Sequence, residues 1–180
     1  MDNQKIRKKI KKTKLISITA AALFAVLVCL IGYYMGADRN WDLQNYHFYN
    51  GYLYSHGKLI TDSIATVQSY LDPLLNSFYY ILISNLSPLQ VNLIIVALQS
   101  LTISSVFFLS MIVFEKNSYF SKFILSLIVS TSAIFGPIFW SEIGGTMGDT
   151  LLVFPVIISI IFIVKTITTA DNIKQRIIFA

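Results

Sequence analysis

Long apolar runs separated by short polar segments dominate the chain. Residues 15–35 carry no charged side chain, and such a run is long enough for a helix to cross the hydrocarbon core of a bilayer. A second charge-free stretch covers 73–114 and is too long for one crossing. Two more apolar runs follow at 123–140 and 150–165. The pattern predicts an all-α, polytopic transmembrane helical protein.

The stretch 73–114 is interrupted by Asn85, Ser87 and Pro88. A proline disfavours helix at the residue before it, so we predict a break near 85–88. The first part, 73–84, would form a helix of about 18 Å, which is too short to cross. The second part, 89–114, is long enough. If the short helix lies in the outer interface, the chain has four spanning helices.

The positions of the basic residues decide whether 73–84 lies in the outer interface or crosses the membrane. Residues 1–14 hold seven of the fourteen Lys and Arg. With 73–84 at the interface, the tail 1–14, the loop 115–122 and the segment 166–180 lie on one side. Together with Lys165, at the adjoining end of the last span, they hold twelve of the fourteen basic residues. Only Arg39 and Lys58 then fall in the outer segments, 36–88 and 141–149. The positive-inside rule favours this arrangement and predicts a cytoplasmic N-terminus.

The amino-acid composition excludes several other classes of protein. Charged residues make up 13% of the chain, against about 25% in soluble domains. The net charge of +5 comes from a tail rather than from a basic face with aromatic readers, so we expect no nucleic-acid partner. Because Cys29 is the one cysteine, a disulfide within the chain is excluded. The run 15–35 exceeds a signal-peptide apolar region, so we predict an uncleaved span.

The first outer loop carries the candidate chemistry. We predict an interfacial helix over about 40–56, capped by Gly57 and rich in Trp and Tyr. Asp42 falls in this helix, where a partly desolvated carboxylate could act as a base on a substrate hydroxyl. Two plainer interpretations stay open: Asp42 as a helix cap and the helix as an aromatic membrane anchor. Six of the nine acidic residues fall on the outer side, which suggests a site there.

Three elements in order resemble the C-type (GT-C) membrane glycosyltransferases, the superfamily of the aminoarabinose transferases and the protein O-mannosyltransferases. The first is the string Trp-Asp-x-x-Asn-Tyr-His-x-Tyr-Asn at 41–50, in which Asp42 and Tyr46 match the opening of the family's large outer loop. The second is Asp72-Pro73, and the third is Asp149 at the outer end of a later span. The string at 41–50 is similar to that of a bacterial branch of the superfamily.

The resemblance implies transfer of a hexose or pentose from a polyprenyl-phosphate donor to a lipid or glycan acceptor. The reaction would invert the anomeric carbon, at the outer face of a bacterial cytoplasmic membrane. It implies Asp42 as the catalytic base. It implies substrate binding by Tyr46, His47, Asn50, Asp72 and Asp149. No cofactor follows from the sequence; a divalent metal held by Asp42 and Asp149 stays open. His47 could equally be an interfacial histidine, and Asp149 an N-cap.

Two other functions remain. With four predicted spans the chain covers only the N-terminal part of a family member, so a truncated or accessory membrane protein without catalysis is the first alternative. A transporter subunit is the second. Transporters usually place ionisable groups or broken helices near the bilayer midplane. Here the one charged residue of the predicted spans is Lys165, at the very end of the last one.

Overall fold

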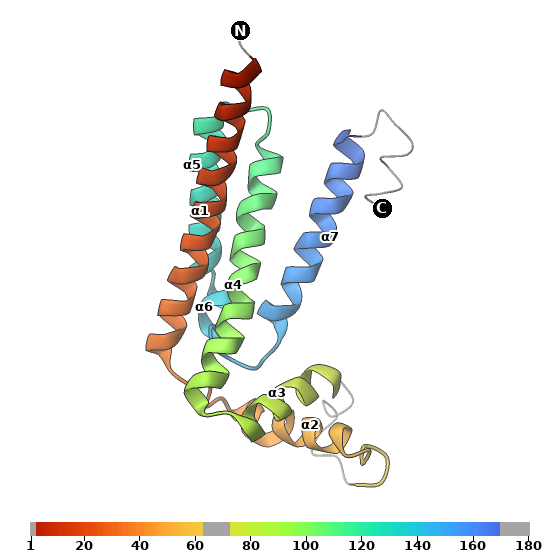
Figure 1. The fold of residues 1–180 in the computed structure, drawn as a ribbon. Coiled ribbons are helices and arrows are strands. Elements are labelled where there is room, and N and C mark those ends of the chain that lie inside the picture. Colours follow the sequence, from red (N-terminus) through yellow and green to blue (C-terminus); the bar gives the residue numbers. More distant parts are fainter. Residues whose placement is uncertain (1–2, 63–72, 170–180) are drawn as a thin grey trace.

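The computed structural model describes residues 3–62 and 73–169. This part of the chain contains helices joined by short loops and no strand, as the sequence predicts (Figure 1). Its elements are α1 (Asn3–Met35), η1 (Leu43–His47), α2 (Phe48–Ser55), α3 (Pro73–Asn85), α4 (Pro88–Val113), α5 (Tyr119–Ile134), α6 (Pro137–Glu142) and α7 (Asp149–Thr169).

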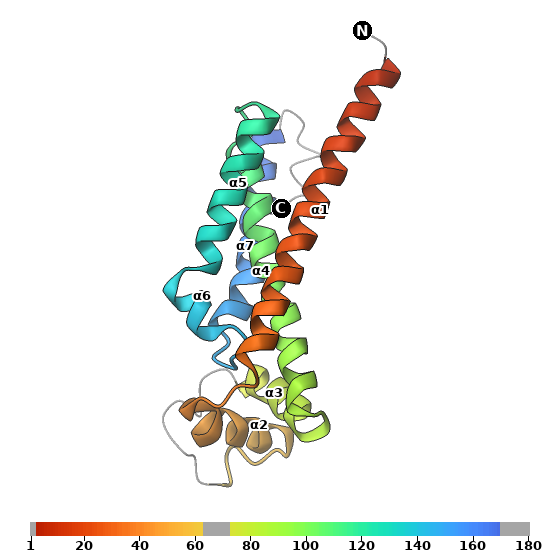
Figure 2. The same ribbon diagram turned by 90° about the vertical axis from the view of Figure 1, so that its left-hand side faces the viewer.

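Three helices are long and apolar enough to cross a membrane: α1 over Ile10–Met35, α4 over Pro88–Val113 and α7 over Asp149–Ile167. That is the pattern of a membrane protein. The helix α4 is central, because α1, α5 and α7 all pack against it (Figures 1 and 2). Apolar side chains fill the contact, among them Phe24 of α1 and Phe107 of α4, whose ring centroids are 6.0 Å apart.

The expected span at 123–140 is divided into two helices. Here α5 ends at Ile134 and α6 begins at Pro137. Proline lacks the N–H that would continue the helix, and its ring collides with the carbonyl four residues before it. Gly136 takes an extended conformation, with ψ 138°. With 16 residues, α5 alone is about 24 Å long, which is shorter than the hydrocarbon core.

A lobe formed by η1, α2 and α3 lies at one end of the bundle and runs across its axis (Figure 1). The segment expected to be helical at 40–56 is helical, with a π-helical turn, η1, in its first half. The helix α3 ends at Asn85, close to the predicted break. A capping box between Ser87 and Gln90 then starts α4. Gly57 follows α2 with φ +66°, as expected of a C-cap.

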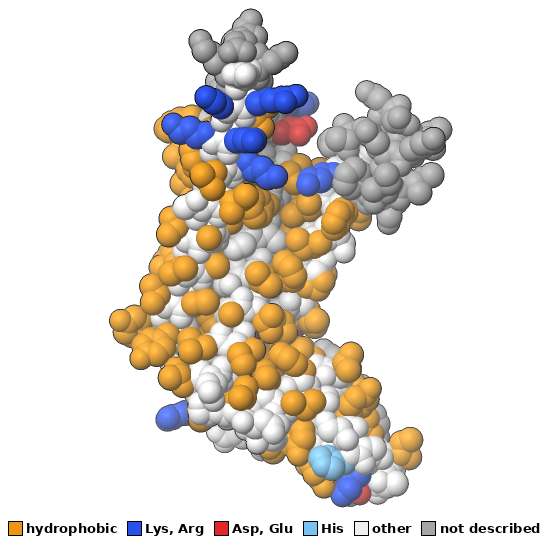
Figure 3. All heavy atoms as spheres, viewed as in Figure 1, with side chains coloured by type: hydrophobic (Ala, Val, Ile, Leu, Met, Phe, Trp, Pro, Cys, Tyr) orange, Lys and Arg blue, Asp and Glu red, His pale blue; other side chains and the backbone are white. Residues whose placement is uncertain are grey.

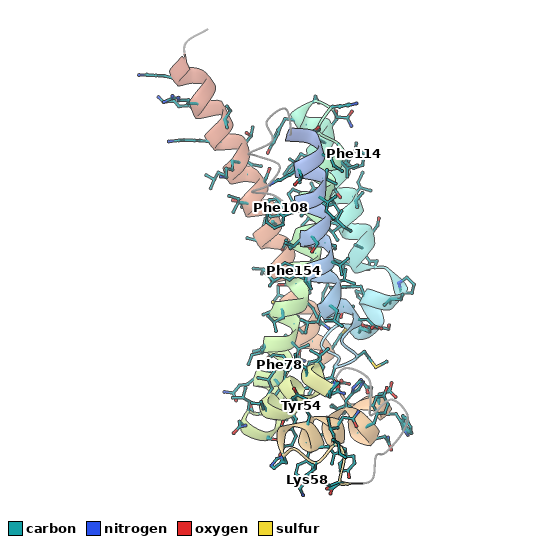
Figure 4. The ribbon with its side chains drawn as sticks, turned by 90° about the vertical axis from the view of Figure 1, so that its right-hand side faces the viewer. Tyr54, Lys58, Phe78, Phe108, Phe114 and Phe154 are labelled. Carbon is teal, nitrogen blue, oxygen red and sulfur yellow. The ribbon has the colours of Figure 1, made fainter. Side chains whose placement is uncertain are left out.

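Charge separates the two ends of the molecule. Lysine and arginine side chains gather around the N-terminal end of α1, and the middle of the bundle is apolar on the face shown (Figure 3). Figure 4 follows the length of the molecule from Phe114 near the basic end through Phe154 to Phe78 and Tyr54 in the lobe. Lys58 lies at the far end of the lobe. The lobe and the basic tail therefore occupy opposite ends of the apolar bundle.

Gly51 allows α2 and α3 to approach closely. A Cβ atom at this position would lie 2.2 Å from the backbone oxygen of Asn76 and 2.5 Å from the Cβ atom of Tyr80. Neither atom can move without displacing α3 itself. The lobe therefore depends on a residue without a side chain at this crossing.

We expect Gly51→Ala to lower the free energy of unfolding of the lobe by about 1–3 kcal/mol, as overpacking does. Alanine favours a helix by about 1 kcal/mol over glycine, so a net loss would report the clash. Hydrogen exchange of the α2 and α3 amides measures the effect. Gly57→Asn is the control, because nothing lies within 4 Å of a Cβ there and asparagine tolerates positive φ. Unchanged protection in Gly51→Ala would contradict the close packing.

Candidate functional site

A cavity of about 580 Å³ lies at the lobe end of the bundle. Its walls come from the segment that follows α1 and from the loop between α6 and α7, which are about 100 residues apart in sequence. Three carboxylates and one guanidinium line it: Asp38, Asp42, Glu142 and Arg39. The remaining walls are Met35, Gly36, Ala37, Asn40, Trp140, Ser141, Ile143, Gly144, Gly145 and Met147.

Asp38 joins the two walls. Its Oδ1 accepts the backbone N–H of Asn40 at 2.8 Å, and its Oδ2 accepts the Asn40 side-chain amide at 2.9 Å. The same Oδ2 accepts the backbone N–H of Thr146 at 2.8 Å and the Thr146 hydroxyl at 2.7 Å. Thr146 is 1% exposed. One carboxylate therefore fixes the end of α1 to the loop before α7.

Asp42 immediately precedes η1 and is half-buried. The Asn40 side-chain oxygen accepts the backbone N–H of Leu43 at 2.7 Å, which fixes the start of the turn. Tyr46, one helical turn on, is buried. Burial raises the pKa of Tyr46, and the nearby Asp42 carboxylate raises it further. The tyrosine therefore keeps its proton beside the carboxylate.

The next two candidates in the string, His47 and Asn50, lie within the lobe instead. The Nδ1 atom of His47 lies 2.7 Å from Oδ1 of Asn76 on α3. Asn50 is 0% exposed within α2. Neither residue is among those that line the cavity of Asp42. In this structure the two side chains belong to the packing of the lobe.

Asp149 is exposed and begins α7. It lines a different cavity, an apolar one of about 540 Å³ between α4, α6 and α7. The structure therefore places Asp42 and Asp149 in separate cavities. In residues 3–62 and 73–169, no group of three or more His, Cys, Asp or Glu side chains could hold a metal ion. Asp72 lies outside the described residues.

Glu142 links these two regions. Its carboxylate accepts the backbone N–H of Thr150 at 3.3 Å, in the first turn of α7. Burial raises the pKa of Glu142; the hydrogen bond from Thr150 opposes the rise, and the charge of Asp149 adds to it. Glu142 therefore faces Asp42 across one cavity and is electrostatically coupled to Asp149.

The raised pKa of Glu142 has a consequence for stability. Above the ordinary value of 4.5 the unfolded carboxyl ionises while the folded one still holds its proton, so the free energy of unfolding falls as pH rises through this window. We expect Glu142→Gln to remove the fall while keeping an oxygen for Thr150. The stability difference between variant and parent should grow between pH 4 and pH 7.5 in denaturant titrations in micelles. A difference that is constant with pH would contradict the assignment.

A buried glutamine of α4 holds the loop that carries Glu142. The Nε2 atom of Gln99 donates to the backbone oxygen of Glu142 at 2.9 Å and to the Thr150 hydroxyl at 2.9 Å. Its Oε1 atom accepts the backbone N–H of Gly144 at 2.9 Å. Gln99 is 1% exposed, so these bonds replace water inside the bundle. These hydrogen bonds fix the wall of the Asp42 cavity that contains Glu142 and Gly144 to the central helix α4.

The sequence gives no individual role to Asp38, Glu142 or Thr146, and it predicts only a hydrogen bond to another helix for Gln99. That bond is present, from Gln99 of α4 to Thr150 of α7. A signal was available for the two acids, because both belong to the group predicted on the outer side. The Asp-x-Asn spacing at 38–40 also suits a side chain that bonds the backbone two residues on. No spacing shows that Gln99 contacts the loop before α7, or that Thr146 in that loop contacts Asp38.

Comparison of the chain with protein-family models, with curated proteins and with solved structures finds no match.

Proposed function

We propose that the chain acts as a C-type membrane glycosyltransferase. It would transfer a hexose or pentose from a polyprenyl-phosphate donor to a hydroxyl of a lipid or glycan acceptor. One observation carries the proposal: Asp42, beside the buried Tyr46, lines a cavity of about 580 Å³ at the end of the bundle opposite the basic tail. An acidic cavity beside a membrane-embedded bundle suits a hydroxyl acceptor and a lipid-borne donor.

The proposed topology has four crossings. The helices α1, α4 and α7 cross in full, and α5 and α6 together complete the remaining crossing. The basic N-terminal end then faces the cytoplasm, as the positive-inside rule favours. The lobe of η1, α2 and α3 lies in the outer interface, so the cavity of Asp42 opens at the outer face of a bacterial cytoplasmic membrane.

In the proposed reaction Asp42 takes the proton of the acceptor hydroxyl. The oxygen attacks the anomeric carbon of the donor as the bond from that carbon to the phosphate oxygen breaks. The polyprenyl phosphate leaves with the bonding electron pair, and the configuration at the anomeric carbon inverts. A positioned base of this kind contributes about 10²–10⁴-fold to a rate.

The other residues support these steps. Arg39 lines the same cavity, and its guanidinium suits a phosphate oxygen of the donor. Tyr46 lies beside Asp42 and keeps its proton, so it can donate to the carboxylate. We assign Asp72 and Asp149 to acceptor binding, on the resemblance. We assign His47 and Asn50 to the packing that positions the lobe.

The test is direct transfer by the chain in proteoliposomes. Vesicles with and without the chain are given a panel of polyprenyl-phosphate hexoses and pentoses, with a bacterial lipid extract as acceptor. We expect release of free polyprenyl phosphate and labelling of the acceptor, in amounts that depend on the chain. If the folded chain released nothing from any donor, the proposal would fail, and a catalytically inactive accessory protein would be the better interpretation.

A further inference from the structure

The N-terminal part of α1 carries a group of basic side chains at the end of the bundle opposite the lobe (Figure 3). The helix begins at Asn3 and ends at Met35, and a crossing of about 20 residues that ends at Met35 begins near Ile16. The residues before Leu15 therefore continue the helix beyond the hydrocarbon core, where α1 extends past the other helices (Figure 2). Five cations of this part have exposed side chains: Arg7, Lys8, Lys11, Lys12 and Lys14.

The contacts of α1 with the bundle determine which side of the helix is free. An α-helix turns by about 100° per residue, and the side chains that α1 buries fall within an arc of about 100°. They are Ser17, Ala20, Ala21, Phe24 and Val28. The Tyr119 hydroxyl of α5 donates to the backbone oxygen of Thr13 at 2.9 Å, which fixes the rotation of α1 next to the cations. All five cations fall outside the buried arc, so they face away from the bundle.

These five cations have no anionic partner within the described part of the chain. The sequence of α1 contains no Asp or Glu, and the ion pair found among the described residues joins Lys58 and Asp62 in the lobe. Arg7 and Lys11 are four residues apart, as are the two lysines at 8 and 12, and like charges at this spacing destabilise a helix. The face therefore favours an anion from outside the chain.

Apolar side chains continue the same face toward the middle of the bilayer. At about 100° per residue, Leu15 and Ile18 project on the same side of the helix as Lys11 and Lys14. Leu15 is 65% exposed and Ile18 is 47% exposed. Val26, two turns further on, is also exposed. Cations are thus followed by apolar surface along one face of α1, which is the order of charge and hydrocarbon along an anionic phospholipid.

The position of the cations selects lipid over nucleic acid. Arg7 lies about 10 Å from Lys14 along the helix axis, so all five charges lie within about one Debye length of the headgroups. A zwitterionic headgroup adds an ammonium group that the lysines repel. Single-stranded nucleic acid is bound by aromatic side chains between cations, and α1 has no aromatic residue before Phe24.

We propose that this face of α1 binds an anionic phospholipid, with the lipid phosphate at Lys11 and Lys14 and an acyl chain along Leu15 and Ile18. Orientation in the membrane requires only that the cations lie near the end of the span. It requires neither a continuous helix nor an apolar row on the same face. The binding requires no sugar transfer, so it is tested independently of the proposed function.

The experiment measures which lipid contacts this face, by quenching of one tryptophan in the whole chain. Trp41→Phe and Trp140→Phe remove both native tryptophans, and Ile18→Trp supplies the reporter in the lipid-exposed row. Vesicles hold phosphatidylglycerol and phosphatidylcholine, and one of the two carries bromine, which quenches tryptophan only at contact. Because anionic headgroups are attracted to each nearby Lys or Arg, we expect phosphatidylglycerol to associate at least threefold more strongly than phosphatidylcholine. In 1 M NaCl, where the Debye length is about 3 Å, the preference should fall below 1.5-fold.

Two variants of equal net charge test the location. In the reporter chain, Lys11→Gln with Lys14→Gln removes the cations next to the apolar row, and we expect the preference to fall below twofold. The control is Lys116→Gln with Lys165→Gln, which removes two exposed cations from the same end of the bundle and leaves α1 unchanged. It should keep a preference of at least threefold. Both leaflets hold the same lipids, so a variant that inserts in the opposite orientation is measured in the same way.

Three results would overturn the proposal. The first is equal quenching by the two lipids at low salt. The second is a preference that survives 1 M NaCl or the loss of Lys11 and Lys14, because the cations of this face would then not be its cause. The third is displacement of the phosphatidylglycerol by a single-stranded RNA, which would assign the face to nucleic acid.

Discussion

Replacing Asp42 by Asn is expected to lower the rate constant of sugar transfer at least 100-fold, with the KM for the donor changed only a few fold. The η1 turn should keep its geometry, because the hydrogen bond at its start runs from the Leu43 N–H to the Asn40 side chain and does not involve Asp42. What the variant loses is the basicity that takes the acceptor proton, and such a loss is worth about 10²–10⁴-fold. Initial rates at saturating and limiting donor measure the two constants separately.

The matched control is Asp62→Asn. Asp62 forms an exposed ion pair with Lys58 at 3.6 Å, and such pairs contribute about 0–1 kcal/mol. Transfer by this variant should stay within twofold of the parent. If Asp42→Asn also transferred sugar within fivefold of the parent, Asp42 would not be the base, and Glu142 on the same cavity would be the next carboxylate to test.

Replacing Asp38 by Asn is expected to lower the free energy of unfolding by about 2–4 kcal/mol. The carboxylate accepts hydrogen bonds from two donors of Asn40 and two of Thr146. An amide offers one oxygen in place of two and turns an N–H₂ group toward donors. Losing charge-assisted bonds around a buried partner costs about 1–3 kcal/mol for each group left unsatisfied. Denaturant titration in micelles gives the value.

A double-mutant cycle with Thr146→Val tests whether the effect passes through the loop. Thr146 is buried, and valine has its shape without the hydroxyl. We expect the two substitutions to be coupled by about 0.5–3 kcal/mol, as contacting residues are. Additive effects would mean that Asp38 and Thr146 act independently and that the two walls of the cavity are held by other contacts.

The helices of the bundle could be predicted because their apolar runs are long and uncharged. The break at 85–88 could be predicted because proline restricts its neighbour. The break at Gly136–Pro137 follows from the same rule, yet a prediction based on the absence of charge over 123–140 passes over it. The hydropathy of a segment indicates whether it lies in lipid or in water. Whether its helix is continuous depends on single backbone groups, such as the N–H that proline lacks.

In the candidate site, only the contacts between residues close in sequence could be predicted. The pair of Asp42 and Tyr46 is one helical turn apart, so spacing alone brings the two together. Glu142 reaches the same cavity at the start of a loop that Gln99 holds, whereas Asp38 reaches it from the segment after α1. Contacts between residues about 45 or more positions apart depend on how α1, α4 and α7 pack, and periodicity within one helix carries no information about that packing.

The hydrogen bonds of the Gln99 amide also imply an order in which α4 and α7 insert into the membrane. Its partners in the α6–α7 loop and in α7 follow it in the chain by 43 to 51 residues, which takes about 2–10 s to synthesise at the usual elongation rates. When α4 first enters the bilayer, this polar group has none of them, and leaving an amide unsatisfied in lipid is unfavourable. We therefore expect the nascent α4 to remain beside the translocation machinery or at the bilayer surface until these partners are synthesised. The arrival of α7 would then supply the Thr150 hydroxyl to Gln99 and complete the insertion of α4.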